Sequence, residues 1–202
     1  MGASSEDTKA GLRRGYLARS RAMASEALAR AAEAACAHVV GTLAFRDARH
    51  VVVYAARPWE LDAHPIAAAA ARNGVPTYYP RLAKGTLEFV RAARVDLAPG
   101  AFGIEEPAPD GPRLPAATDG VLFVVPGVAF DRQGGRLGSG LGCYDRALAA
   151  FPRAIRIGLA LHELLVDRLP TDPWDVPVDA IATEQGVFVA DSTVDEHAGD
   201  LP

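Results

Sequence analysis

The fold of this chain is decided by the stretch from Val121 to Arg146, which reads VLFVVPGVAFDRQGGRLGSGLGCYDR. The apolar run up to residue 125 predicts a buried strand that ends at Pro126. A loop with five glycines follows, at positions 134, 135, 138, 140 and 142, and residues 144–150 then predict a helix. Glycine lets backbone N–H groups approach an anion closely, and a helix N-terminus favours negative charge. The stretch therefore predicts an anion-binding site.

Two charged side chains in this stretch fit a phosphate ligand. Arg136 can neutralise a phosphate, and Asp145 can hold a cation. A flexible surface turn is the alternative, but five glycines with an embedded Arg and Asp favour phosphate binding. The spacing fits neither a Walker A loop nor a dinucleotide fingerprint. Ser139 is not in a nucleophile elbow, because leucines stand at 137 and 141 where that motif needs glycine.

The composition of the 202 residues is that of an ordinary globular protein, with 50% hydrophobic and 23% charged residues. We expect a single domain over residues 1–190 and a flexible tail at 191–202. A net charge of −4 argues against a general nucleic-acid binder. Two distant cysteines predict neither a zinc site nor a disulfide framework. With no signal-peptide pattern and no apolar run of about 20 residues, we expect a cytoplasmic monomer or weak homo-oligomer with no membrane partner.

The rest of the chain alternates predicted strands and helices. Helices are expected at residues 4–22, 25–45 and 62–72, strands at 51–54, 76–80, 86–90, 121–125, 155–161 and 180–183, and a loop at 97–113. This order predicts an α/β fold, with a central, mostly parallel, Rossmann-like sheet flanked by helices in a three-layer domain. Ligands bind beyond the carboxyl ends of the strands in such sheets, and the glycine loop lies at one of these ends.

Two further pairs of charged residues fit the same ligand. Lys9 and Arg13 lie four residues apart, and therefore on one face of the first predicted helix. They form either a two-pronged phosphate grip or part of a solvated basic face. Asp175 lies in a Pro-rich stretch and alone would be a turn residue. Paired with Asp145, it could complete an oxygen site for Mg²⁺, which takes few carboxylates besides phosphate oxygens and waters.

Other polar residues follow the first two predicted strands. Glu60 has no evident structural duty and could hydrogen-bond a nitrogen-rich ring. Trp59 could stack on such a ring, although a packed or half-exposed position is favoured. Asp62 is most simply the N-cap of the next helix. Arg81 could reach the same ligand, whereas residues 103–107, with their paired acids, are typical of a solvated loop.

Taken together, these residues resemble the 5-formyltetrahydrofolate cyclo-ligase family, also called methenyltetrahydrofolate synthetase. The similar positions run through most of the chain: Lys9, Arg13, Glu60-Leu61-Asp62, Pro80-Arg81, Gly103-Ile104, Glu106-Pro107, residues 126–131, residues 135–146, Asp175-Val176 and Thr183-Glu184. The resemblance implies one α/β domain that converts 5-formyltetrahydrofolate to 5,10-methenyltetrahydrofolate with ATP and Mg²⁺. Its partners would be small molecules, ATP and a reduced folate.

The resemblance also implies roles for single residues. Catalysis would use Lys9, Arg136 and Asp145. ATP would contact Lys9, Arg13, Arg136, Leu137, Gly138, Ser139, Gly140, Leu141, Gly142, Cys143 and Tyr144. The folate would contact Ala55, Glu60, Ser139, Gly140, Gly142 and Cys143. Asp145 and Asp175 would hold Mg²⁺.

The implied chemistry needs no covalent nucleophile. ATP phosphorylates the N5-formyl oxygen, N10 attacks the activated carbon, and phosphate leaves, so positioning and charge neutralisation supply most of the catalysis. The chain departs from the family pattern at Ala63, Cys143, Leu164 and Trp174, where the family usually has Thr, Tyr, Gln and His. Two alternatives therefore stay open. One is a paralogue that activates a different amide or carboxylate, and the other is a non-catalytic folate- or nucleotide-binding protein.

Overall fold

The computed structural model describes residues 5–191, and a seven-stranded sheet runs through its centre. Its strand order is β12-β11-β9-β6-β1-β2-β3. The inner strands pair in parallel, and only the edge strands β3 and β12 are antiparallel to their neighbours. The strands are β1 (His50–Val52), β2 (Thr77–Ala83), β3 (Thr86–Arg91), β6 (Val121–Pro126), β9 (Ile155–Leu159), β11 (Ala180–Thr183) and β12 (Gly186–Val189). The predicted α/β fold with a mostly parallel central sheet is confirmed.

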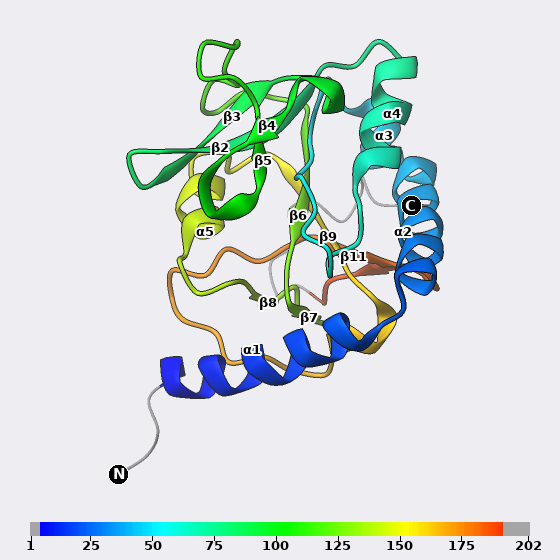
Figure 1. The fold of residues 1–202 in the computed structure, drawn as a ribbon, viewed down its shortest axis with the longest axis vertical. Coiled ribbons are helices and arrows are strands. Elements are labelled where there is room, and N and C mark those ends of the chain that lie inside the picture. Colours follow the sequence, from blue (N-terminus) through cyan, green and yellow to red (C-terminus); the bar gives the residue numbers. More distant parts are fainter. Residues whose placement is uncertain (1–4, 192–202) are drawn as a thin grey trace.

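Helices cover both faces of this sheet (Figure 1). On one face lie α2 (Ser25–Gly41), α3 (Leu43–Asp47) and α4 (His64–Arg72), and on the other lies α5 (Cys143–Leu148). Alternate strand residues serve the two faces, as a pleated strand requires. Val51 and Leu122 pack in the core under α2 and α4, whereas Val52 and Phe123 pack in the core under α5. The central strands are thus buried on both sides.

The long helix α1 (Ser5–Ala22) crosses the end of the molecule at which β6 finishes (Figure 1). Its Leu12 and Tyr16 pack against a small core of Ala129, Leu137 and Leu169. Ala129 and Leu137 belong to β7 (Ala129–Asp131) and β8 (Arg136–Leu137), which form a three-stranded sheet with β10 (Leu165–Val166). This packing places the first helix beside the glycine loop.

Several element boundaries differ from the predictions. The helix predicted over residues 25–45 breaks at Thr42, whose hydroxyl donates to the Val39 carbonyl and accepts the Phe45 N–H, so that a new helix begins. Ala63, not Asp62, is the N-cap of α4, although Asp62 accepts the His64 N–H. The loop 97–113 contains β4 (Ala98–Pro99), β5 (Glu105–Glu106) and the short helix η2 (Ala101–Gly103). The strands β7, β8, β10 and β12 were not predicted.

The ends of the chain leave two predictions untested. Ser4, a predicted helix cap, and residues 192–202 of the predicted tail lie outside the described residues. At the last described position, Asp191 donates its N–H to the Arg132 carbonyl. Among residues 5–191, no helix is both long enough and apolar enough to cross a membrane.

Candidate functional site

Asp131 organises the first part of the glycine loop. Its buried carboxylate accepts the N–H groups of Gln133 and Gly135 at Oδ1, at 3.0 and 2.7 Å, and the Leu169 N–H at Oδ2, at 2.8 Å. A Cβ at position 135 would lie 2.5 Å from Oδ2, so the backbone can come this close only as glycine. The carboxylate thereby fixes the turn that leads directly into Arg136.

Arg136 is buried against the beginning of α5. Its Nη2 donates to Oδ1 of Asp145 at 2.8 Å, and 5% of its side chain is exposed. Its guanidinium carbon lies 5.6 Å from the ring centre of Tyr144. The same Asp145 oxygen accepts the Val176 N–H at 3.2 Å, which ties α5 to the segment that contains Asp175. The predicted loop residues and Asp175 thus belong to one connected site.

Two basic residues of α1 reach this site. The buried Lys9 Nζ donates to Oδ2 of Asp172 and of Asp175, at 2.7 and 2.6 Å. Burial alone lowers the pKa of Lys9, but the hydrogen bonds and negative charges of the two aspartates outweigh it, so the pKa is raised. Arg13 Nε donates to the Gly138 carbonyl at 2.7 Å. The solvated-face alternative is therefore wrong for Lys9, and both residues contact the predicted site.

A cavity of about 110 Å³, which we call the loop pocket, lies between these groups. Its charged lining residues are three cationic and three anionic side chains, Lys9, Arg13, Arg136, Asp145, Asp172 and Asp175. The remaining lining residues are Leu137, Gly138, Ser139, Gly140, Gly142, Cys143, Tyr144 and Trp174. Except for Leu141, every residue predicted to bind ATP or Mg²⁺ lines this pocket.

A second cavity of about 460 Å³, the large cavity, adjoins the loop pocket. The two share a wall that consists of Arg13, Arg136, Gly138, Ser139, Cys143 and Tyr144. Its volume falls within the roughly 300–1,000 Å³ of sites that hold small organic ligands. Of the predicted folate contacts, four line the large cavity: Ala55, Glu60, Ser139 and Cys143. The other two, Gly140 and Gly142, line only the loop pocket. Leu141, a predicted ATP contact, lines the large cavity instead of the loop pocket.

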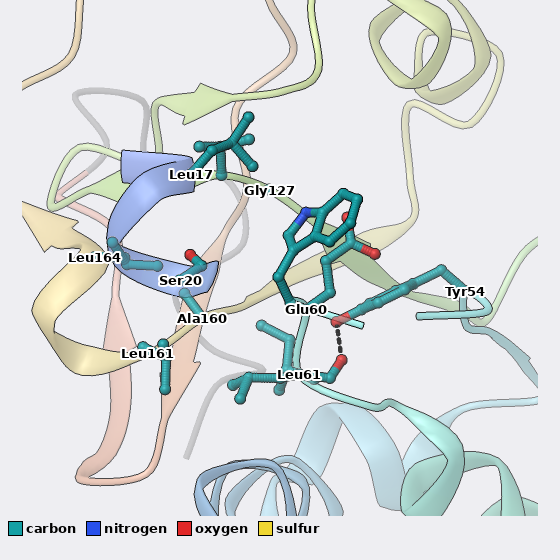
Figure 2. Close-up of a pocket in the computed structure, with 12 residues that line it drawn as sticks. Leu17, Ser20, Tyr54, Glu60, Leu61, Gly127, Ala160, Leu161 and Leu164 are labelled. Carbon is teal, nitrogen blue, oxygen red and sulfur yellow. Dashed lines mark hydrogen bonds between the residues drawn. The ribbon is translucent and has the colours of Figure 1, made fainter. Parts of the chain in front are cut away.

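Glu60 lies beside the large cavity and a small recess of about 20 Å³ that adjoins it. In Figure 2, Glu60, Tyr54 and Leu61 face the recess with residues of α1, and the Tyr54 hydroxyl donates to the Leu61 carbonyl. Burial raises the pKa of Glu60, and the N–H and positive charge of Arg57 oppose the shift. Glu60 also has a structural duty, since Oε2 accepts the Arg57 N–H at 2.9 Å.

Trp59, the neighbour of Glu60, lines both the recess and the large cavity. The guanidinium carbon of Arg21 lies 4.3 Å from the centre of its ring, and that of Arg57 lies 5.8 Å away. Cations over an aromatic face are attracted by its quadrupole. The favoured prediction of a half-exposed, packed indole agrees with this arrangement, and the ring still borders the cavity.

The interpretation of residues 103–107 as a solvated loop is wrong for Glu106. This residue is 8% exposed, and its Oε2 lies 3.3 Å from Nη1 of Arg81. Arg81 also donates to the Pro107 carbonyl at 3.0 Å, and it does not line the large cavity. A Cβ at Gly100 would lie 2.5 Å from Cγ of Glu106. Arg81 and Glu106 therefore hold the chain together beside the cavity, and of the two only Glu106 also lines it.

The loop pocket fits Mg²⁺ only with help from a ligand. Among residues 5–191, no group of three His, Cys, Asp or Glu side chains is placed to hold a metal ion by itself. Asp145, Asp172 and Asp175 nevertheless line one pocket, and Mg²⁺ usually binds few carboxylates together with phosphate oxygens and waters. The donor set thus fits a metal that arrives with a phosphate.

Sequence reasoning missed three kinds of contributor. Asp131 belongs to the motif of residues 126–131, but the motif alone assigns it no role, and no motif includes Asp172. The only signal for Asp172 was its position three residues before Asp175 in a Pro-rich turn. The apolar part of the large cavity, with Leu82 and Phe102, gave no signal because those side chains come from a hairpin and a loop.

This arrangement defines an α/β protein with a two-part ligand site at the carboxyl edge of a parallel sheet. One part is charged and glycine-rich, and the other is larger and mostly apolar. A model of the 5-formyltetrahydrofolate cyclo-ligase family matches residues 5–184. The chain therefore belongs to the 5-formyltetrahydrofolate cyclo-ligase family, and the resemblance drawn from its motifs is confirmed.

Individual relatives agree with this family. The 5-formyltetrahydrofolate cyclo-ligase of Escherichia coli K12 is 34% identical over 148 residues, which cover 70% of this chain and 81% of that protein. That of Mycolicibacterium smegmatis is 41% identical over 92 residues, 44% of this chain and 46% of that protein. The solved 5,10-methenyltetrahydrofolate synthetase of Aquifex aeolicus is 30% identical, with a TM-score of 0.80 over 95% of this chain and 98% of that one. A Mycoplasma pneumoniae synthetase, 22% identical with a TM-score of 0.69 over 87% of this chain and 98% of that one, shows the shared fold.

Proposed function

We propose that this protein converts 5-formyltetrahydrofolate to 5,10-methenyltetrahydrofolate at the expense of ATP. The observation that carries the proposal is the shared wall between the two cavities. It would bring a phosphate held in the loop pocket next to an organic ligand held in the large cavity. Family membership supplies the identity of the two substrates. We also expect the enzyme to act in the cytoplasm as a monomer or weak homo-oligomer.

The proposed reaction has two steps. The γ-phosphoryl group moves from ATP to the N5-formyl oxygen, which releases ADP and leaves an activated carbon. The N10 lone pair then attacks this carbon, the carbon–oxygen bond to phosphate breaks, and the N10 proton passes to solvent. The products are ADP, inorganic phosphate and the methenyl compound, and catalysis consists mainly of positioning and charge neutralisation.

The charged residues divide the binding work in this proposal. Arg13 and Arg136 would neutralise phosphate oxygens. The Lys9 ammonium group donates two of its N–H groups to Asp172 and Asp175, and it would donate the third to a phosphate oxygen. Asp145 and Asp175 would hold Mg²⁺, which neutralises negative charge on a transferring phosphate when bound. Their present contacts with Arg136 and Lys9 keep the carboxylates oriented toward the pocket.

Ala55, Glu60 and Cys143 would contact the folate from the large cavity. A carboxylate only accepts hydrogen bonds, whereas a protonated carboxyl group can also donate one. Burial raises the pKa of Glu60, so protonation of its carboxylate is easier than for an exposed glutamate. Glu60 would thus hydrogen-bond the nitrogen-rich ring. Cys143 replaces a larger tyrosine of the family at the shared wall, which leaves more room there.

The test combines purified protein with ATP, Mg²⁺ and 5-formyltetrahydrofolate and follows both the absorbance of the methenyl product and the release of ADP. The proposal expects equal amounts of the two products, and neither when ATP is omitted. ADP release only with another amide or carboxylate would replace the proposal by the paralogue. Binding of ATP and folate without turnover would indicate a binding protein.

A further inference from the structure

The Lys9 ammonium group has two carboxylate partners, and only one of them has a part in the proposed function. Nζ donates to Oδ2 of Asp172 at 2.7 Å and to Oδ2 of Asp175 at 2.6 Å. Asp175 would hold Mg²⁺, whereas Asp172 has no role so far. A carboxylate that binds a metal attracts a nearby ammonium group less strongly, because the metal compensates its negative charge. Of the two aspartates, Asp172 would then attract Lys9 the more strongly.

A closed turn holds the two carboxylates side by side. The Asp175 N–H donates to the Asp172 carbonyl at 3.0 Å, and the Asp172 N–H donates to Oδ2 of Asp175 at 2.8 Å. Pro173 occupies the second position of this turn, where its fixed φ is favoured. Directly after the turn, Val176 donates its N–H to Oδ1 of Asp145, the other predicted metal ligand. The chain thus links Asp145 to Asp175 and places Asp172 at the other end of the turn.

Lys9 depends on a nearby anion in order to stay in the loop pocket. The residue is 6% exposed, and a buried charge without a partner is strongly unfavourable. An ammonium group has three N–H groups, of which the two aspartates accept two. If Asp175 were its sole acidic partner, binding of a cation there would drive the ammonium group out of the pocket. A second carboxylate removes this conflict.

We propose that Asp172 is a positioning residue, which keeps the Lys9 ammonium group in the loop pocket while Asp175 binds Mg²⁺. The inference rests on the proposed function. It gives the two acids of the turn different roles, since Asp175 serves the metal and Asp172 serves the lysine. Lys9 then keeps an N–H for a phosphate oxygen, and it does not compete with the metal for one carboxylate.

Asp172→Asn distinguishes this role from a general effect of charge. Asparagine keeps the shape of the side chain but removes one negative charge from a site for a polyanion, and by electrostatics alone this should strengthen nucleotide binding. The positioning role predicts weaker binding in the presence of Mg²⁺, because Lys9 then has no uncompensated carboxylate beside it. Without Mg²⁺, Asp175 still holds Lys9, and no weakening is expected.

The first experiment measures binding of AMP-PNP, an ATP analogue that resists phosphoryl transfer, by isothermal titration calorimetry in Mg²⁺ and in EDTA. Asp172→Asn should weaken binding about tenfold in Mg²⁺, as loss of a residue that orients a metal site commonly does, and should not weaken it in EDTA. Asp167→Asn is the matched control, because Asp167 is exposed and lines neither cavity. Unchanged or tighter binding in Mg²⁺, or equal weakening in both conditions, overturns the proposal.

The second experiment repeats the Mg²⁺ titration in a Lys9→Met background. If Asp172 acts through Lys9, adding Asp172→Asn should not weaken binding further, because the residue that it positions is absent. The double variant leaves no buried lysine short of a partner, so it also tests the proposal if Asp172→Asn alone fails to fold. Further weakening in this background would show that Asp172 itself contacts the metal or the nucleotide, which contradicts the positioning role.

Failure of this inference can be told apart from failure of the proposed function. If the native protein binds no AMP-PNP in Mg²⁺ and forms no methenyl product, the proposed function fails. If the native protein binds AMP-PNP and turns over, but Asp172→Asn behaves like Asp167→Asn, this inference alone is refuted.

Discussion

Asp131→Asn tests whether one buried carboxylate holds the glycine loop. The substitution keeps the shape, but an amide has one oxygen where the carboxylate has two. If its oxygen faces Gln133 and Gly135, its NH₂ group points at the Leu169 N–H, which lies 2.8 Å from Oδ2 in the native chain. The opposite orientation leaves two N–H groups unsatisfied instead of one. Either way, at least one buried donor loses its acceptor.

The size of the effect follows from these contacts. A hydrogen bond to a charged group contributes about 1.5–3 kcal/mol, and a buried unsatisfied donor costs about 1–3 kcal/mol. Because the native Asp131 is 1% exposed, water cannot replace the lost partner. We expect the free energy of unfolding to fall by about 3 kcal/mol for this variant. We also expect kcat/KM for ATP to fall, because the turn that places Arg136 is loosened.

Urea unfolding followed by circular dichroism measures the first quantity, and steady-state kinetics at a temperature where both proteins are folded measures the second. Asp110→Asn is the control, since Asp110 is exposed. Exposed substitutions usually change stability by less than about 0.5 kcal/mol. A loss for Asp131→Asn no larger than that of Asp110→Asn would refute the account of the loop.

The other predictions concern the two cavities. Arg136→Ala should lower kcat/KM for ATP about 100-fold, because it removes a preorganised positive charge. The control Arg153→Ala removes an exposed arginine and should leave kcat/KM for ATP unchanged. A loss confined to folate affinity in Arg136→Ala would contradict the assigned role. Asp145→Asn should raise the Mg²⁺ concentration for half-maximal rate at least about tenfold, and an unchanged Mg²⁺ dependence would contradict the metal assignment. Burial raises the pKa of Glu60 above its usual 4.5, so the folded state binds more protons than the unfolded state above that pH, and stability falls as pH rises. Glu60→Gln should therefore gain stability relative to the native protein at pH 7 but not at pH 4 in urea unfolding, and an equal difference at both pH values would show that the pKa is not raised.

The sequence was sufficient wherever the signal is local. Continuous apolar runs such as residues 121–125 predict strands buried on both faces, and β6 is such a strand. The glycine spacing of residues 134–142 and the four-residue spacing of Lys9 and Arg13 likewise depend on nothing distant. For this reason six of the seven strands of the central sheet and the charged half of the site could be predicted before any contact was known.

The rest depends on partners that are far away in the sequence. In its local sequence Glu106 is an ordinary loop residue, and only the folded chain pairs it with Arg81. Asp172 likewise has the local sequence of a turn residue, and the Lys9 ammonium group that donates to it lies 163 positions earlier. The apolar part of the large cavity likewise forms only when the β2–β3 hairpin folds beside the η2 turn. Burial and pairing of this kind are properties of the folded chain, so a local pattern cannot reveal them.

The charge balance of the loop pocket explains why cation-rich motifs do not make it a strongly positive site. Lys9 is shared between Asp172 and Asp175, and Arg136 is paired with Asp145, so most of the positive charge that the motifs supply is already compensated. A polyanionic triphosphate therefore needs further positive charge in order to bind well. The same aspartates are the oxygen donors that Mg²⁺ prefers, so an ion held by them would supply that charge. In the proposed reaction, the pairing that fixes the cations in place would therefore make nucleotide binding depend on the metal.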